Sequence, residues 1–200
     1  MDNRIDTVIP ILVCCAVALI EVPDLKLQVD AGEILAVGGA AAPALWSRLA
    51  GEPGRPPGQV LYKGKDISAW PPAQRRAEGL LALFSGPQVP EGLTLMQLLR
   101  LSASGEAFRR LRESASTYAE KLGVDSDWLD IPLSDPRWKP MAARAEWIQA
   151  ACLRPALIVS AAATDKETSA LAQALANEGA ALILTGPGSV FPRARRCQLP

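Results

Sequence analysis

Residues 34–51 read ILAVGGAAAPALWSRLAG, and this stretch already suggests how the chain is organised. The apolar residues 34–37 have the composition of a buried strand, they run into Gly38-Gly39, and the helical stretch that follows ends at Gly51. A strand, a glycine turn and a helix in this order are the layout of a phosphate-binding loop. Such a loop uses a lysine to hold the terminal phosphates and a serine or threonine to hold Mg²⁺, but residues 40–45 are AAAPAL. The layout of the loop is therefore present without the side chains that give it its chemistry.

The composition excludes several classes of function. A chain of 200 residues that is 49% hydrophobic has the size of one domain and can bury a full core. Its 21 lysines and arginines balance 21 aspartates and glutamates, so no global positive field favours a nucleic-acid partner. The chain contains no histidine, which removes the commonest general base and the commonest metal ligand. We therefore expect no metal, no cofactor and no nucleic acid.

The apolar run at residues 8–20, VIPILVCCAVALI, raises the question of a membrane segment. Its length of 13 residues falls short of the roughly 20 that a helix needs to cross a bilayer. The preceding MDNRID is net acidic, whereas a signal peptide begins with positive charge. We interpret the run as one or two buried strands and expect no transmembrane segment in this chain.

Strands alternate with helices along most of the sequence, which is typical of an α/β domain with a largely parallel sheet. The helical stretch at about 94–153 interrupts this alternation and indicates an inserted subdomain. Thr164 and Glu167 have the spacing of a capping box for a helix over 165–178. The arginine-rich ending RARRCQL is interpreted as surface charge. Further strands are expected at residues 25–29, 59–62, 80–84, 157–159 and 181–184.

Four segments carry a resemblance to a known family. They are DLKLQVDAGEILAVGG (24–39), GQVLYKGKDISAWPPAQRRAEGL (58–80), EGLTLMQLLRL (91–101) and RPALIV (154–159). In this order and spacing, they resemble the nucleotide-binding subunit of ABC transporters along nearly the whole chain. The resemblance implies a single P-loop NTPase-like (ABC ATPase-like) α/β domain over 1–200 with an N-terminal antiparallel strand region. The core would span about 1–93 and 154–200, and the helical subdomain about 94–153.

The positions that carry catalysis in this family hold other residues here. The vestigial loop keeps Gly38 and Gly39, Ser85 stands where a glutamine is expected, and Gly186 replaces the switch histidine. Ala161 and Ala162, after Ser160, occupy the place of the metal-binding aspartate and the catalytic glutamate. Near the expected signature, Leu133-Ser134 is followed by Asp135-Pro136 instead of glycines.

The resemblance therefore implies a non-hydrolysing ABC ATPase-like subunit with a structural or regulatory role in a membrane-associated transporter or maturation complex. Such a subunit would be cytoplasmic and peripheral at the membrane, and would bind a permease-like subunit, a second ABC-type subunit, or both. Two alternatives stay open: a nucleotide or anion sensor that uses the amides of Gly38-Gly39, and an enzyme that reuses the old cleft. Among subfamilies, the length, LTLMQLLRL and the ending RARRCQL favour the haem-export and cytochrome c maturation ATPase. PPAQRRAEGL is more similar to branched-chain amino acid or lipopolysaccharide transporter ATPases, and YKGKDI to the iron–sulfur assembly ATPase.

A partner surface is the remaining hypothesis. In the family, the segment around Ser85 and the helical subdomain receive the membrane partner, so Ser85, Val89 and Leu93 are candidates for this contact. Trp128 and Trp138 are candidates because tryptophans dominate interface energetics. Packing inside the subdomain is the alternative explanation for both tryptophans.

Overall fold

The structure is a computed structural model, and it describes residues 11–19, 22–54, 58–84, 92–102, 108–161, 165–185 and 194–199. The strands are β1 (Leu12–Leu19), β2 (Val22–Val29), β3 (Ile34–Gly38), β4 (Gln59–Tyr62), β5 (Lys65–Asp66), β6 (Leu80–Leu83), β7 (Leu157–Ser160), β8 (Ala181–Leu184) and β9 (Arg195–Gln198). The α-helices are α1 (Ala42–Ala50), α2 (Pro72–Ala77), α3 (Leu95–Ser102), α4 (Phe108–Lys121), α5 (Ala142–Leu153) and α6 (Lys166–Asn177). Two 3-10 helices, η1 (Ser126–Asp130) and η2 (Pro136–Met141), lie between α4 and α5.

The central sheet has five strands in the order β6-β7-β8-β3-β9, and every pairing within it is parallel. Its inner strands β7 and β8, with sequences LIVS and ALIL, are buried at every residue. Continuous burial of this kind is expected when both faces of a parallel sheet are covered. The prediction of an α/β fold with a largely parallel sheet is confirmed.

A second sheet has the strand order β2-β1-β4-β5 and is antiparallel throughout. Strand β1 forms from the apolar run at residues 8–20 and pairs with β2 on one side and β4 on the other. The expected N-terminal antiparallel region is therefore present, and β2 begins earlier than the strand predicted at 25–29.

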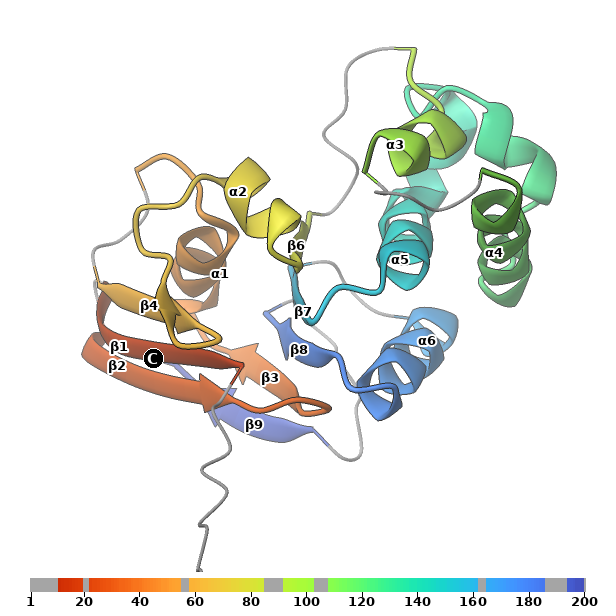
Figure 1. The fold of residues 1–200 in the computed structure, drawn as a ribbon. Coiled ribbons are helices and arrows are strands. Elements are labelled where there is room, and N and C mark those ends of the chain that lie inside the picture. Colours follow the sequence, from red (N-terminus) through yellow and green to blue (C-terminus); the bar gives the residue numbers. More distant parts are fainter. Residues whose placement is uncertain are drawn as a thin grey trace, which may run out of the picture.

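Two apolar clusters hold the layers together, one on each face of the parallel sheet. Leu81 and Leu83 of β6 face the cluster that includes α3, α4, α5 and α6. Leu80 faces the other cluster, which joins α1 to the antiparallel sheet. Figure 1 shows the resulting arrangement, with α3, α4 and α5 gathered on one side of the sheet and α1 with β1, β2 and β4 on the other. The period of two along each strand thus assigns successive side chains to different clusters.

The start of α6 differs from the sequence prediction. Its N-cap is Asp165, whose Oδ1 accepts from the Thr168 N–H at 2.8 Å, while the Asp165 N–H donates to Thr168 Oγ1 at 2.9 Å. The capping box therefore pairs Asp165 with Thr168, and the prediction of Thr164 with Glu167 is wrong by one residue. Thr164 lies outside the described residues. A carboxylate accepts from helix N-terminal amides better than a threonine hydroxyl does, which explains the choice of Asp165.

No helix in the described part of the chain is long and apolar enough to cross a membrane.

Candidate functional site

The carboxyl ends of β3, β7 and β8 meet at one edge of the parallel sheet. In α/β folds of this kind, ligands bind outside the carboxyl ends of the strands. The register that pairs Ser160 with Leu184 brings Ser160 and Thr185 together, and the Ser160 carbonyl accepts from the Thr185 N–H at 2.8 Å. Ala161, the next residue, donates its N–H to the Leu83 carbonyl at 3.2 Å. The described side chains at this edge carry neither a carboxylate nor a cation.

The glycine turn leads from β3 into α1 as the sequence predicts. Helix α1 has Ala41 as its N-cap with no side-chain hydrogen bond, and its first turn carries no acidic residue. The Ala42 N–H donates to the Gly39 carbonyl at 3.2 Å, and Pro43 has no N–H. Two backbone positions at the helix start, Ala42 and Pro43, are therefore not open to an anion.

The glycines of this turn have a second neighbour that the sequence did not reveal. Strand β9 runs beside β3, with Gln198 paired to Gly38, and the Leu199 N–H donates to the Gly38 carbonyl at 2.8 Å. Gly39 has φ +103°, and a Cβ built on it would lie 1.6 Å from the Leu199 carbonyl oxygen. Gly39 is thus required by the close passage of the C-terminal strand, independently of any phosphate.

Arg195 and Arg196 are exposed, as the interpretation of RARRCQL as surface charge expects, and residues 195–198 also form β9, an edge strand of the central sheet that was not predicted. The sequence RRCQ has no apolar alternation, so no local pattern predicts this strand. Arg195 also connects β9 to its neighbours. Its guanidinium forms an ion pair at 2.5 Å with Glu33, which directly precedes β3, and donates to the carbonyl of Gln28 in β2.

Four of the candidate positions, Ser85, Val89, Ala162 and Gly186, lie outside the described residues. Leu93 is described and half-buried, and its carbonyl accepts from the Leu133 N–H at 2.8 Å. This bond, with the bridge between Thr94 and Pro132, ties the start of α3 to the region where the family signature is expected.

That region, residues 126–141, is built from η1 and η2. Asp125 caps η1 and Asp135 caps η2 through the backbone N–H groups of Asp127 and Arg137. Hydrogen bonds from the Arg137 guanidinium and backbone lower the pKa of Asp135 to about 2. Asp135 thus caps a local turn, and its carboxylate also forms an ion pair with the Arg137 guanidinium at 2.9 Å.

The tryptophans of the helical region are mainly core residues. Trp138 is 1% exposed and Trp147 is fully buried, which contradicts the expectation that Trp138 anchors a partner. Trp128 is half-buried and meets Trp138 edge to face, with ring centroids 5.8 Å apart. The alternative of packing inside the subdomain explains Trp138, while Trp128 keeps part of its surface exposed.

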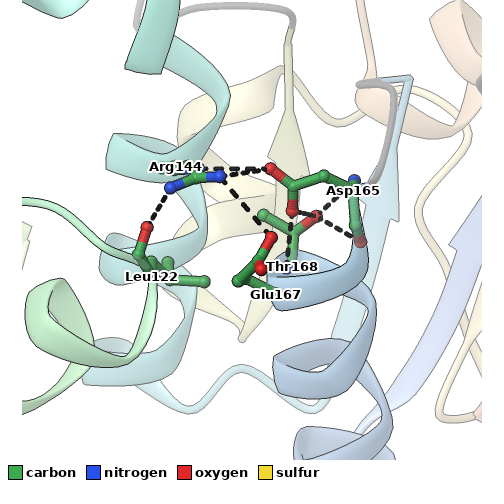
Figure 2. Close-up of polar contacts among 5 residues, drawn as sticks. All are labelled: Leu122, Arg144, Asp165, Glu167 and Thr168. Atoms are coloured by element: carbon green, nitrogen blue, oxygen red, sulfur yellow. Dashed lines mark hydrogen bonds and ion pairs between the residues drawn. The ribbon is translucent and has the colours of Figure 1, made fainter.

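A polar cluster centred on Arg144 joins the helical region to α6 (Figure 2). The guanidinium donates to the Leu122 carbonyl at the end of α4 and to Asp165 Oδ2 at 2.8 and 3.2 Å. It also lies 3.6 Å from the Glu167 carboxylate. Burial acts to raise the pKa of Asp165, but hydrogen bonds from Thr168 and Arg144 outweigh it and hold this pKa below its usual range. We call Leu122, Arg144, Asp165 and Glu167 the Arg144 cluster.

A second arginine, Arg75 of α2, is 1% exposed and fixes the end of α1. Its guanidinium donates to the carbonyls of Leu49 at 2.6 Å, Ile67 at 2.8 Å, Arg48 at 3.0 Å and Trp70 at 3.1 Å. A cation at the C-terminus of a helix also complements the helix dipole.

The surface beside α2 is hollowed. A cleft of about 680 Å³ lies between α2 and α3, and an adjoining cavity of about 300 Å³ is lined by Phe84 and the start of α2. Leu101 on the rim of the cleft is 74% exposed, and Arg76 on α2 lines both hollows. The name α2–α3 cleft is used below for the larger hollow and the adjoining cavity together.

Sequence reasoning found the glycine turn and the strand ends but missed Arg75, Arg144 and β9. The partners of both arginines include carbonyls distant in sequence, and no local pattern marks such partners. Among the described residues, no group of three His, Cys, Asp or Glu side chains lies close enough to hold a metal ion.

No protein-family model and no curated protein matches this chain. Solved structures do match its fold. A nucleotide-free ATP-binding cassette from an ABC transporter superposes with a TM-score of 0.72 and 17% identity, covering 96% of this chain and 88% of that chain. A cassette in its ADP conformation gives a TM-score of 0.69 and 18% identity, with 96% and 87% covered.

A third structure is cbiO1 from Clostridium perfringens, part of the ABC transporter complex cbiONQ. It superposes with a TM-score of 0.63 and 16% identity, covering 88% of this chain and 78% of that chain. At these identities the likeness shows the fold alone. The chain has the fold of an ATP-binding cassette, as its sequence predicts.

Proposed function

We propose that this protein is a non-hydrolysing ABC ATPase-like subunit with a structural or regulatory role in a membrane-associated complex. The observation that carries the proposal is the set of residues at the carboxyl edge of the sheet, where Gly38-Gly39, Ser160-Ala161 and Thr185 follow the strands of an ATP-binding-cassette fold. The strand ends are in place, but the groups that would act on a phosphate are not among them.

The physical reason is that phosphoryl transfer depends almost entirely on positioning and on electrostatic stabilisation of phosphate, metal and water. A lysine at the loop, carboxylates after β7 and a polarising residue after β8 would supply this field. Alanine and glycine at positions 161, 162 and 186 supply none of it. We infer that the protein neither hydrolyses ATP nor holds Mg-ATP tightly.

The α2–α3 cleft supports a docking role. It combines an exposed apolar residue, Leu101, with cationic Arg76, so an apolar segment that carries a carboxylate would complement it. The solved relative cbiO1 is part of a transporter complex. By analogy, we place a permease-like membrane partner in this cleft, which would make the protein cytoplasmic and peripheral at the membrane. A second ABC-type subunit could cover the carboxyl edge.

The first experiment tests the loss of activity. Phosphate release by the purified protein, alone and with its co-purified partner, is expected to stay at background, and calorimetry with Mg-ATP is expected to show no saturable binding. Turnover that disappears on Ala161→Arg, at the carboxyl edge, would overturn the proposal. An exposed control, Ala69→Arg, lies on a turn away from that edge.

The second experiment tests docking. Leu101→Asp places a charge on the rim of the α2–α3 cleft and is expected to release the partner in pull-downs and native mass spectrometry. Thr117→Asp adds the same charge on an exposed position of α4 and serves as the matched control. If both variants retain the partner equally, the α2–α3 cleft is not the docking site. The identity of the captured partner also tests the proposal that the protein is of the haem-export and cytochrome c maturation type.

A further inference from the structure

A second cavity lies on a different face, between α4 and α6. It has a volume of about 350 Å³ and is lined by Tyr118 and Lys121 of α4 and by Lys166, Glu167, Ala170, Leu171, Ala174, Leu175 and Glu178 of α6 and its end. This size lies at the lower end of the range for small-molecule sites, about 300–1,000 Å³. Figure 1 shows α4 and α6 on the same side of the sheet, well away from α2. We call this cavity the α4–α6 groove.

The groove has an apolar floor and small walls. Leu171 and Leu175 are 8% and 3% exposed and form the floor, while Ala170 and Ala174 are exposed and keep the walls low. Tyr118 is half-buried and contributes an aromatic face. An apolar chain laid along α6 would therefore cover alanine and leucine surface that water now contacts.

The charges of the groove are unevenly distributed. Lys121 and Lys166 stand at the end nearest the Arg144 cluster, and within the described part of the chain neither forms an ion pair. Glu167, at the same end, is paired with Arg144 at 3.6 Å (Figure 2). Glu178 lies at the far end of α6. The end with the two lysines is net cationic by one charge, because Lys121, Lys166 and Arg144 carry three positive charges against the two carboxylates of Asp165 and Glu167.

We propose that the α4–α6 groove binds a single-chain amphiphile with a carboxylate head, such as a medium-chain fatty acid. The carboxylate lies between Lys121 and Lys166, and the chain extends over Leu171 and Leu175 towards Glu178. Residues 166 to 178 span about 18 Å at the helical rise of 1.5 Å per residue, which accommodates a chain of medium length. A ligand in this position touches α4 and α6 at once and adds a second connection beside the Arg144 cluster.

Calorimetry with sodium decanoate below its micelle concentration tests the proposal, with NMR shifts to locate the contact. Saturable binding is expected, with shifts at Tyr118, Ala170 and Ala174 and a rise in Tm. Ala174→Trp fills the groove from an exposed position and is expected to abolish binding. The double charge reversal Lys121→Glu with Lys166→Glu is expected to weaken binding about tenfold or more, because it replaces two attractive charges beside the ligand carboxylate by two repulsive ones.

The controls separate this site from general affinity for amphiphiles. Ala73→Trp places the same bulk in the α2–α3 cleft, and Lys26→Glu reverses an exposed charge on β2. Both variants are expected to bind decanoate as the unmodified protein does. Decyltrimethylammonium, which has a cationic head, is expected not to bind. Equal binding of the two amphiphiles, or unchanged decanoate binding by Ala174→Trp, would overturn the proposal.

Discussion

The Arg144 cluster is open to a quantitative test, because one side chain connects the end of α4, helix α5 and the start of α6. The substitution Arg144→Met keeps most of the apolar stem and removes the guanidinium. It leaves the Leu122 carbonyl and the Asp165 and Glu167 carboxylates without their shared donor. The capping box between Asp165 and Thr168 is local and is expected to survive.

The expected cost follows from the exposure of the partners. The Arg144 side chain is 20% exposed and that of Asp165 is 42% exposed, so the pair is neither buried nor fully solvated. Exposed pairs contribute about 0.2–1 kcal/mol, and breaking a buried pair costs about 3–5 kcal/mol. The forked contact to Asp165 and the carbonyl bond argue for a value between these limits. We expect Arg144→Met to lower the free energy of unfolding by about 2 kcal/mol.

Urea denaturation of a double-mutant cycle with Asp165→Asn isolates the ion pair, because asparagine still caps a helix. We expect a coupling free energy of about 1 kcal/mol near neutral pH. The folded pKa of Asp165 lies below its usual value, so the contribution of the pair is fully present above the unfolded pKa of about 3.9. It is lost as the pH falls through the folded pKa, when the carboxylate becomes protonated. The coupling should therefore decline on acidification.

Arg109→Met is the matched control. Arg109 pairs with Glu113 on the surface of α4, with side chains 91% and 66% exposed, and its loss is expected to cost less than about 0.5 kcal/mol. An Arg144→Met variant that unfolds at the same urea midpoint as Arg109→Met would refute the reasoning. So would a coupling that stays constant through the titration of Asp165.

Three other predictions test the fold and the lost activity. Arg75→Met removes a buried guanidinium from four backbone carbonyls and is expected to lower the free energy of unfolding by about 3–5 kcal/mol. Urea denaturation measures this change, and a loss below about 1 kcal/mol would mean that water replaces the guanidinium. Gly39→Ala forces a Cβ to within 1.6 Å of the Leu199 carbonyl oxygen at a φ of +103°, so we expect β9 to detach and Tm to fall. Hydrogen exchange at residues 195–198 should accelerate, and unchanged exchange there would contradict this prediction. Ala162→Glu alone is expected to leave phosphate release at background, because catalytic groups that act as a unit are not restored singly, and turnover by this variant would show that the site is more complete than we propose.

The fold was largely predictable because its strands and helices are short segments with clear local patterns. The runs LIV at 157–159 and ALIL at 181–184 are apolar throughout, and a glycine follows the strand at 34–37, so the architecture of alternating strands and helices is visible in the sequence. The cap of α6 was misplaced by one residue because threonine and aspartate are adjacent at 164–165 and both are common N-caps. The absence of charged residues directly after β7 and β8 could also be predicted, because it depends only on residue identity.

The sequence alone determined the succession of strands and helices, the glycine turn and the residue types at the strand ends, because these depend on neighbours within about ten positions. Only the tertiary structure decided that Trp138 is buried, that β9 lies beside β3 against Gly39, and that Arg75 and Arg144 join distant segments. Strand RRCQ has no apolar alternation, and backbone carbonyls such as those of Leu49 and Leu122 accept hydrogen bonds whatever side chain they carry. Contacts made through the backbone, between segments far apart in the chain, leave no periodic trace in the sequence and become visible only once the chain is folded.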